Sequence, residues 1–220
     1  MPLPSIEIET APNPRHAVIW LHGLGADGRD FEPIVPELVD ASWPPVRFVF
    51  PNAPVRPVTI NGGMRMRAWY DIFGAQIAAQ QDVAGIRASI ASLEELIARE
   101  GERGIAPERV ILAGFSQGGA IVISGGVRCA SRLGGIIALS TYLPMADKTD
   151  AEASSANRDV PIFMAHGMLD PTISHALGEM SRDYLAQRGY NIDWHAYPMA
   201  HQVCAEEIAD LKRWMTARLR

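Results

Sequence analysis

The sequence predicts an α/β protein built on a mostly parallel, twisted sheet with helices on both faces. Short runs rich in apolar and β-branched residues alternate with longer segments of helical period along the 220 residues. That alternation is typical of buried parallel strands joined by crossover helices. The hydrophobic fraction of 48% is enough for a substantial core. No internal repeat or linker divides the chain, so we expect residues 1–220 to form a single domain.

Six short apolar runs, each bounded by turn residues, are predicted to form the strands of this sheet. They are residues 17–22, 47–50, 109–115, 134–140, 161–166 and 192–197. The alternating segment SIEIET near the N-terminus is a candidate for an additional edge strand. Residues 148–159, rich in small polar side chains, are expected to form an exposed loop between two of the strands.

Four helices are predicted between or after these strands. The clearest runs over residues 82–99, where apolar residues recur three or four apart at Val83, Ile86, Ile90, Leu93 and Ile97. Asp82 is available as its N-terminal cap, and Gly101 is expected to end it. The other three helices are predicted to begin at Gln117, near Ser174 and near Ala205.

Charge and composition narrow the class of function. The formal net charge is −5, with acids and bases interspersed, so the sequence predicts neither a nucleic-acid surface nor a polybasic lipid-binding patch. The N-terminus does not resemble a secretory signal, and no apolar run approaches the roughly 18 residues of a membrane span. We therefore expect a cytoplasmic protein that acts on small molecules. Cys129 and Cys204 are expected to be reduced thiols, and their spacing predicts no metal site.

The segment GFSQGG, which contains Ser116, has the pattern of a nucleophile elbow. This motif requires a strand, a sharp turn that carries the nucleophile, and a helix that begins at once. An apolar run precedes the serine and an apolar, glycine-rich segment follows it, although Gly125 and Gly126 weaken the predicted helix. Gly114 and Gly118 would keep neighbouring backbone clear of the turn. Ser116 is the predicted nucleophile; the alternative is a plain turn with a capping serine.

A serine nucleophile needs a general base, and His201 is the predicted base. In this class of sheet the chain order is nucleophile, acid, histidine. His175 and His195 also follow the serine, but His175 lies in the opening turn of a helix, and His195 lies within a strand on the same side as Asp193. His201 directly follows the last strand, at the edge where ligand-facing groups gather. The alternative is a loop histidine or one that flanks the N-terminus of the last helix.

Asp170 is the predicted acid that orients the base. It follows the predicted strand 161–166 closely, at the same edge of the sheet. Asp147 and Asp150 follow the neighbouring strand and are weaker candidates, and Asp183 lies within a helix. The alternative role of Asp170 is to cap the helix that follows it.

Attack on an ester carbonyl places negative charge on oxygen, which backbone N–H groups can stabilise. One predicted donor is the N–H of Gln117, the residue after the nucleophile. The other is the N–H of Leu24, in the glycine-rich segment HGLGADG. A dinucleotide-binding interpretation of the same glycines fails, because no suitably placed acidic residue follows them.

Six ordered blocks of the chain together resemble the carboxylesterase and acyl-protein thioesterase family, also called the phospholipase/carboxylesterase family, of the α/β-hydrolases. The similarity extends from about Ala17 to Trp214. The blocks are LHGLGADGRDF, FPNAPVRPVTINGGMRMRAWYDI, GFSQGGA, LSTYLP, HGMLDPTI and YPMAHQV.

The resemblance implies a single-domain α/β-hydrolase without a large cap domain. It implies the roles of Ser116, Asp170, His201, Leu24 and Gln117 already assigned from the residues. It also implies hydrolysis of esters or thioesters of hydrophobic acyl groups without metal or organic cofactor, and it is compatible with a homodimer.

Two positions depart from the family pattern beside the predicted base. Ala200 stands where such enzymes usually have glycine, and Gln202 replaces a more usual small or acidic residue. Neither change removes a reacting atom, so the departures concern how His201 is held.

The segment 56–73 lacks clear periodicity and carries several large side chains. We expect part of it, including Trp69 and Tyr70, to cover the acyl pocket together with Leu143 from the STYLP block. The alternative is that both aromatic residues belong to the core of a long surface loop.

The sequence thus predicts a cofactor-free serine hydrolase of the carboxylesterase or thioesterase type. A lysophospholipase or an acyl-protein thioesterase is the alternative within the enzyme class, with a lysolipid or an acylated protein as substrate. From another class, the alternative is a catalytically silent acyl-binding module.

Overall fold

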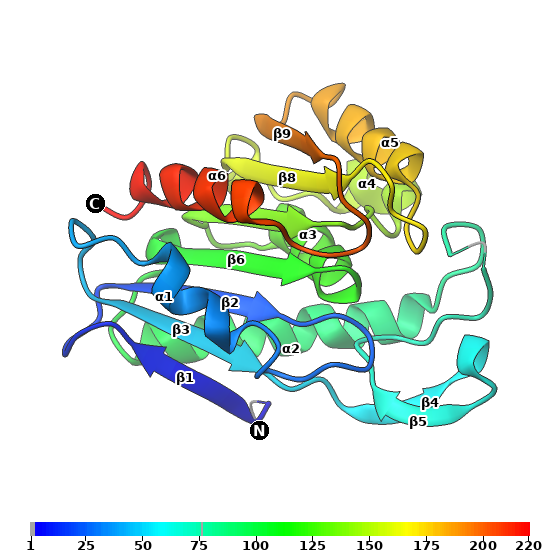
Figure 1. Ribbon diagram of the computed structural model, residues 1–220, viewed down its shortest axis with the longest axis horizontal. Coiled ribbons are helices and arrows are strands. Elements are labelled where there is room, and N and C mark those ends of the chain that lie inside the picture. The colour runs from blue at the N-terminus through cyan, green and yellow to red at the C-terminus, as the bar shows by residue number, and fades with distance from the viewer. Residues whose placement is uncertain (1–2, 76) are drawn as a thin grey trace.

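The computed structural model, which describes residues 3–75 and 77–220, has a central sheet of seven strands in the order β1-β3-β2-β6-β7-β8-β9 (Figure 1). Its strands are β1 (Ser5–Glu9), β2 (His16–Leu21), β3 (Val46–Pro51), β6 (Val110–Phe115), β7 (Gly135–Leu139), β8 (Ile162–Gly167) and β9 (Ile192–Tyr197). β1 pairs antiparallel with β3 at the edge, and the other pairs are parallel. The six predicted strands and the predicted edge strand are confirmed.

Helices cover both faces of the sheet. They are α1 (Val35–Leu38), α2 (Val83–Glu102), α3 (Gln117–Arg128), α4 (Thr149–Glu152), α5 (His175–Ala186) and α6 (Ala205–Thr216). Side chains of α1 and α6 share one buried cluster with one face, and those of α2, α3 and α5 share another cluster with the opposite face. None of the described helices is both long and apolar enough to cross a membrane.

Strand β2 shows why the central strands read as continuous apolar runs. All six of its residues are buried. Alternate side chains enter the two clusters: Ala17, Ile19 and Leu21 on the α2–α3 side, and Val18 and Trp20 on the α1–α6 side. A strand buried on both faces favours apolar residues on both, because neither set of side chains reaches water. The exception in β2 is its first residue, His16.

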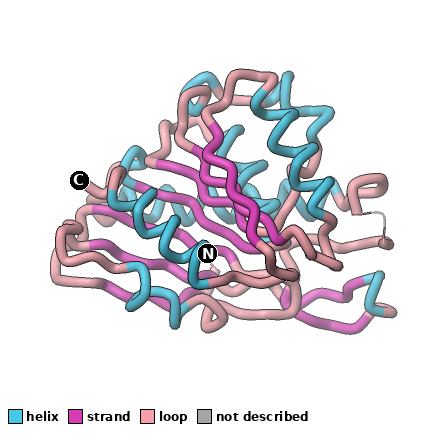
Figure 2. Tube along the Cα trace, turned by 45° about the horizontal axis from the view of Figure 1, so that its top comes forward, coloured by secondary structure: helices cyan, strands magenta, loops and turns pink. Residues whose placement is uncertain are grey.

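The carboxyl ends of the parallel strands lie at one edge of the sheet, at the right of Figure 1, where the loops toward the following helices gather (Figures 1 and 2). A two-stranded hairpin, β4 (Val55–Val58) and β5 (Met64–Arg67), extends beyond this edge. The sequence predicted no element there. Each strand has only four residues, too few to show a clear alternation.

The end of α2 differs from the prediction. Asp82 does cap its start, accepting a hydrogen bond from the N–H of Gly85 at 2.9 Å. Gly101 does not end the helix, however, which continues to Glu102. The residue in the left-handed conformation is Gly104, with φ of 90°, so the chain leaves the helix one turn later than expected.

Two further expectations need correction. Residues 148–159 do not form a simple exposed loop, since they contain α4 and bury Asn157, whose side chain binds backbone groups of neighbouring turns. Helix α3 runs unbroken through Gly125 and Gly126. A Cβ on Gly126 would lie 2.5 Å from the Cδ1 of Ile136, so this glycine allows α3 to pack closely against β7.

Candidate active site

Ser116 occupies a strained turn between β6 and α3. β6 ends at Phe115, and α3 begins at Gln117. The backbone of Ser116 has φ of 54° and ψ of −120°, a conformation that costs a residue with a Cβ roughly 1–3 kcal/mol. Its N–H donates to the carbonyl of Leu139 at 2.9 Å, which helps to hold the turn. The serine hydroxyl therefore lies at the carboxyl edge of the sheet.

Two glycines make this turn possible. A Cβ on Gly114 would lie 2.5 Å from the backbone carbon of Gly118, and a Cβ on Gly118 would lie 2.3 Å from the carbonyl oxygen of Leu21. Both distances are shorter than a carbon side chain tolerates. The glycine spacing in the motif thus reflects the close approach of β6, α3 and β2.

The loops that carry Asp170 and His201 are joined to each other. Beyond β8 and β9, the N–H of Leu169 donates to the carbonyl of Met199 at 3.0 Å. A Cβ on Gly167 would lie 2.3 Å from the carbonyl oxygen of the residue before His201. The pairing of β8 with β9 thus continues into the two loops and places the carboxylate beside the imidazole.

Ser116, His201 and Asp170 form a continuous hydrogen-bonded chain. The Nε2 of His201 lies 2.9 Å from the Oγ of Ser116, and the Nδ1 lies 2.7 Å from the Oδ2 of Asp170. The other carboxylate oxygen accepts the N–H groups of Thr172 and Ile173 at 2.8 and 2.9 Å. Because an ionised carboxylate only accepts, Nδ1 carries the proton and Nε2 can accept the serine proton.

A second histidine, His166, supports the loop of Asp170. Its Nε2 lies 2.9 Å from the carbonyl oxygen of Ile173 and 3.4 Å from the Oδ2 of Asp170. Burial lowers the pKa of His166, so the ring remains uncharged at neutral pH and donates to the carbonyl. Nothing in the sequence singles out this residue, because it lies inside a predicted strand.

The two predicted oxyanion donors lie at one cavity with the nucleophile. Leu24, Ser116 and Gln117 all line a cavity of about 370 Å³. Within the described parts of the chain, neither the N–H of Leu24 nor that of Gln117 has a hydrogen-bond acceptor. Both groups are therefore available to a ligand oxygen beside Ser116.

His22 fixes the start of the loop that carries Leu24. Its Nε2 accepts the N–H of Ala53 at 3.1 Å, and its Nδ1 lies 2.7 Å from the carbonyl oxygen of Gly23. The accepting Nε2 requires the proton to be on Nδ1, which donates to that carbonyl. Burial lowers the pKa of His22, which keeps the ring neutral in this arrangement.

The side chain of Gln117 joins the nucleophile turn to the predicted pocket segment. Its Oε1 accepts the N–H of Trp69 at 2.8 Å, and its Nε2 donates to the carbonyl of Tyr70 at 2.8 Å. The amide is buried and both of its ends are paired with backbone. Gln117 thus sets the position of Tyr70 relative to Ser116, a contribution that sequence reasoning missed.

Of the three predicted pocket residues, the structure places only Tyr70 in the wall of the Ser116 cavity. Trp69 is 1% exposed and belongs to the core, where its indole N–H donates to the carbonyl of His22 at 2.8 Å. Leu143 lines a separate cavity. The remaining walls of the Ser116 cavity are contributed by Leu24, Ile60, Asn61, Ile72, Ala75, Ile77, Gln117, Tyr142, Pro171, Thr172 and Ile173.

The Ser116 cavity is lined neither by His175 or His195 nor by the two cysteines. His175 opens α5, and His195 contacts Asp193, with its Nε2 2.9 Å from Oδ1. Cys129 and Cys204 are unpaired thiols. In residues 3–75 and 77–220, no three His, Cys, Asp or Glu side chains are grouped closely enough to hold a metal ion.

The two departures beside His201 require no special backbone conformation. Ala200 has a negative φ and an exposed side chain, so glycine is not needed there. Gln202 is also exposed, and its N–H donates to the carbonyl of Ala200 at 3.0 Å. His201 is therefore held by this turn and by Asp170.

A buried carboxyl group lies in the first turn of α6, soon after His201. Glu207 is 0% exposed, and neither of its oxygens makes a well-formed hydrogen bond with a described residue. Burial raises the pKa of Glu207 to about 8, although the nearby N–H of Cys204 acts in the opposite direction. The carboxyl group is therefore mostly protonated in the folded protein at neutral pH.

Glu207→Gln is expected to remove a pH dependence of stability. Between the ordinary pKa of 4.5 and about 8, the folded protein keeps a proton that the unfolded chain has lost. The free energy of unfolding therefore falls as pH rises through this window, by an amount on the order of a few kcal/mol. Urea unfolding at several pH values should show a shallower fall in the variant.

The matched control for this measurement is Glu206→Gln, since Glu206 is the exposed neighbour on the same helix. This control should keep the pH dependence of the wild-type protein. If the free energy of unfolding falls as steeply with pH in Glu207→Gln as in the wild type, then Glu207 of the wild type has the same pKa in the folded protein as in the unfolded chain, which contradicts the prediction.

Comparison with protein-family models matches residues 4–219 to a family described as phospholipase/carboxylesterase. Among curated proteins, acyl-protein thioesterase 1 of Yarrowia lipolytica is 38% identical over 224 residues, covering 100% of this chain and 99% of the relative. Acyl-protein thioesterase 1 of Neurospora crassa is 39% identical, covering 92% of this chain and 86% of the relative.

Solved structures agree with these matches. Acyl-protein thioesterase 2 of Zea mays has a TM-score of 0.87 at 26% identity, with 99% of this chain and 100% of that chain covered. The carboxylesterase of Bacillus cereus has a TM-score of 0.76 at 19% identity, with 97% and 94% covered, and supports the fold alone.

Proposed function

Because the chain belongs to the phospholipase/carboxylesterase family of the α/β-hydrolases, we propose that it hydrolyses carboxylic esters or thioesters of hydrophobic acyl groups through an acyl-enzyme on Ser116. The observation that carries this proposal is the hydrogen-bonded chain from Ser116 through His201 to Asp170. A nucleophile, a base and an orienting acid in that order are the requirements of serine acyl transfer.

In the first half of the reaction, the Oγ of Ser116 attacks the acyl carbonyl while the Nε2 of His201 takes its proton. Asp170 stabilises the imidazolium that forms and holds the ring in place. The carbonyl oxygen becomes negative and accepts hydrogen bonds from the N–H groups of Leu24 and Gln117. The imidazolium then gives its proton to the leaving alcohol or thiol.

In the second half, water takes the place of the leaving group. His201 removes a proton from the water, which attacks the acyl-enzyme carbonyl, and the same two N–H groups stabilise the charge. Collapse of this intermediate returns the proton to Ser116 and releases the acid. Every step uses only side chains of this protein, two backbone donors and water.

The acyl group is proposed to occupy the cavity of about 370 Å³ beside Ser116. Much of its wall is apolar, with Ile60, Ile72, Ile77 and Ile173 among the lining residues. An alkyl chain buried there gains the free energy of leaving water.

A substrate series tests the proposal. Hydrolysis should be measured for p-nitrophenyl esters of increasing acyl length, for a lysolipid and for an S-acylated peptide. A fluorophosphonate probe should label the protein stoichiometrically, and peptide mapping should place the adduct on Ser116. An unlabelled protein without esterase activity would instead favour a silent acyl-binding module.

The same series separates the two more specific activities. The likeness to relatives named acyl-protein thioesterase leads us to expect faster hydrolysis of the acylated peptide than of the lysolipid. Rapid turnover of the lysolipid alone would favour a lysophospholipase. A homodimer and a cytoplasmic location remain predictions of the sequence, to be checked by sedimentation and by localisation of the native protein.

A further inference from the structure

Two tyrosine hydroxyl groups meet in the wall of the Ser116 cavity. The Oη atoms of Tyr70 and Tyr142 lie 3.1 Å apart, and each residue is 3% exposed. Burial raises the pKa of both phenols, so both remain neutral and one hydroxyl donates to the other. In an otherwise mostly apolar wall, this pair satisfies two polar groups that would be costly to bury alone.

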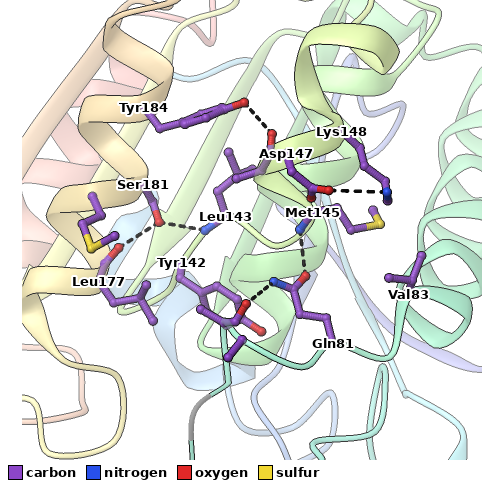
Figure 3. A pocket seen from close by; sticks show the side chains of 14 residues that line it. Gln81, Val83, Tyr142, Leu143, Met145, Asp147, Lys148, Leu177, Ser181 and Tyr184 are labelled. Atoms are coloured by element: carbon purple, nitrogen blue, oxygen red, sulfur yellow. Dashed lines mark hydrogen bonds and ion pairs between the residues drawn. The ribbon is translucent and has the colours of Figure 1, made fainter.

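Tyr142 also borders a second, larger cavity of about 510 Å³. Tyr142 is common to the walls of both cavities, so its side chain lies where they adjoin. The second cavity is shown in Figure 3. Its other lining residues include Gln81, Leu143, Leu177, Ser181 and Tyr184.

Much of the polar lining of this second cavity is already engaged with backbone (Figure 3). Gln81 accepts the N–H of Met145 at 2.8 Å, and Ser181 accepts the N–H of Leu143 at 2.9 Å. The hydroxyl of Tyr184 donates to a backbone carbonyl. The two charged lining residues, Asp147 and Lys148, are at least partly exposed and pair with each other at 3.4 Å. The rest of the lining is mostly alkyl and aromatic surface, which suits an alkyl chain.

We propose that Tyr142 is a specificity-determining residue that limits acyl length by separating the Ser116 cavity from the second cavity. The inference rests on the proposed function, since it concerns the acyl group of the substrate. With the ring present, an acyl chain beside the nucleophile cannot pass directly into the second cavity. Without the ring, the two cavities join and a longer chain can extend into the second one.

The partition is held firmly in place. On one side of Tyr142, the hydroxyl of Thr141 donates to the carbonyl of Ser116 at 2.7 Å. On the other side, the N–H of Leu143 is bound by Ser181. Tyr70, the hydrogen-bond partner of Tyr142, is fixed by the side chain of Gln117. The ring is therefore part of the rigid frame around the nucleophile and acts as a wall.

The test compares Tyr142→Ala with Tyr142→Phe. The measured quantity is the ratio of kcat/KM for the p-nitrophenyl ester of laurate to that for the ester of butyrate. In Tyr142→Ala the ratio should rise about tenfold or more, because methylene groups gain a new apolar site. Tyr142→Phe keeps the ring and should keep the wild-type ratio, while its melting temperature falls because the Tyr70 hydroxyl loses its partner.

A second substitution tests whether the added chain length enters the second cavity. Leu177 lines that cavity and not the cavity of Ser116. In the Tyr142→Ala background, Leu177→Trp should return the ratio toward the wild-type value by filling the space. In the wild-type background, Leu177→Trp should leave the ratio unchanged.

The outcomes separate this inference from the proposed function. An unchanged ratio in Tyr142→Ala, in protein that a fluorophosphonate still labels at Ser116, would overturn the inference and leave the hydrolase function standing. A lowered ratio in the single variant Leu177→Trp would also overturn the inference, because the wild-type acyl chain would then already reach the second cavity. This measurement does not require Tyr142→Ala to fold. A wild-type protein that neither hydrolyses the esters nor reacts with the probe would overturn both.

Discussion

Ser116→Ala is expected to reduce turnover by about 10⁶-fold, the order of loss that removal of the nucleophile causes in other serine hydrolases. The methyl group cannot form the acyl-enzyme, whereas the N–H groups of Leu24 and Gln117 remain to bind a substrate oxygen. The serine Oγ is bonded only to His201 among the described residues, so its loss should leave the fold intact. Ester hydrolysis under saturating substrate measures the effect.

The matched control is Ser131→Ala, at an exposed position outside the cavity. It should retain wild-type turnover and fluorophosphonate labelling, whereas Ser116→Ala should show neither. Comparable turnover in Ser116→Ala would remove Ser116 from the mechanism and with it the proposed acyl-enzyme.

Asp170→Asn is expected to lower kcat by about 10⁴-fold, as the equivalent change does in other serine hydrolases. One carboxylate oxygen accepts two backbone N–H groups, from Thr172 and Ile173. An asparagine must place its amide oxygen there, which turns its NH₂ group toward the Nδ1 of His201. That nitrogen then has to accept, the proton moves to Nε2, and the ring can no longer take the proton of Ser116.

Asp150→Asn is the control for this prediction. Asp150 was a rival acid in the sequence, but in the structure it is exposed and bonded to Arg188. It should keep wild-type kcat. A similar loss in both variants, or none in Asp170→Asn, would contradict the assignment of the acid.

The strands were predictable because the sheet is buried on both sides. Residues 17–21 of β2 are all apolar and buried, and such a run leaves a signal that a few residues suffice to show. The hairpin of β4 and β5 has no such run, and most of its residues are at least partly exposed. Its formation depends on pairing between two segments, which periodicity within either segment does not reveal.

The positions of the three proposed catalytic residues followed from topology. In a parallel sheet, residues just beyond the carboxyl ends of strands come together whatever their separation in sequence. Ser116, Asp170 and His201 follow β6, β8 and β9 in this way. His22 directly follows β2 and His166 lies within β8, but their roles depend on which backbone atoms each ring nitrogen meets, and the sequence does not contain that information.

The pocket was less predictable because it is built from irregular segments. Trp69 and Tyr70 are adjacent, yet one enters the core and the other faces the cavity. Similarly, Leu143 faces the second cavity, while its neighbour Tyr142 contacts both. In a helix or strand the period assigns such faces, whereas in these segments only tertiary hydrogen bonds, such as those of Gln117, decide them.

The positive φ of Ser116 sets a trade-off between thermal robustness and activity at this one position. Glycine adopts such a backbone conformation more readily than any residue with a Cβ, so an engineer who screens variants for heat resistance alone would be drawn to replace Ser116. The substitution would raise stability but remove the nucleophile. Stabilising substitutions are better placed at positions remote from the turn of Ser116. The backbone strain at Ser116 is needed to present the hydroxyl group to the substrate.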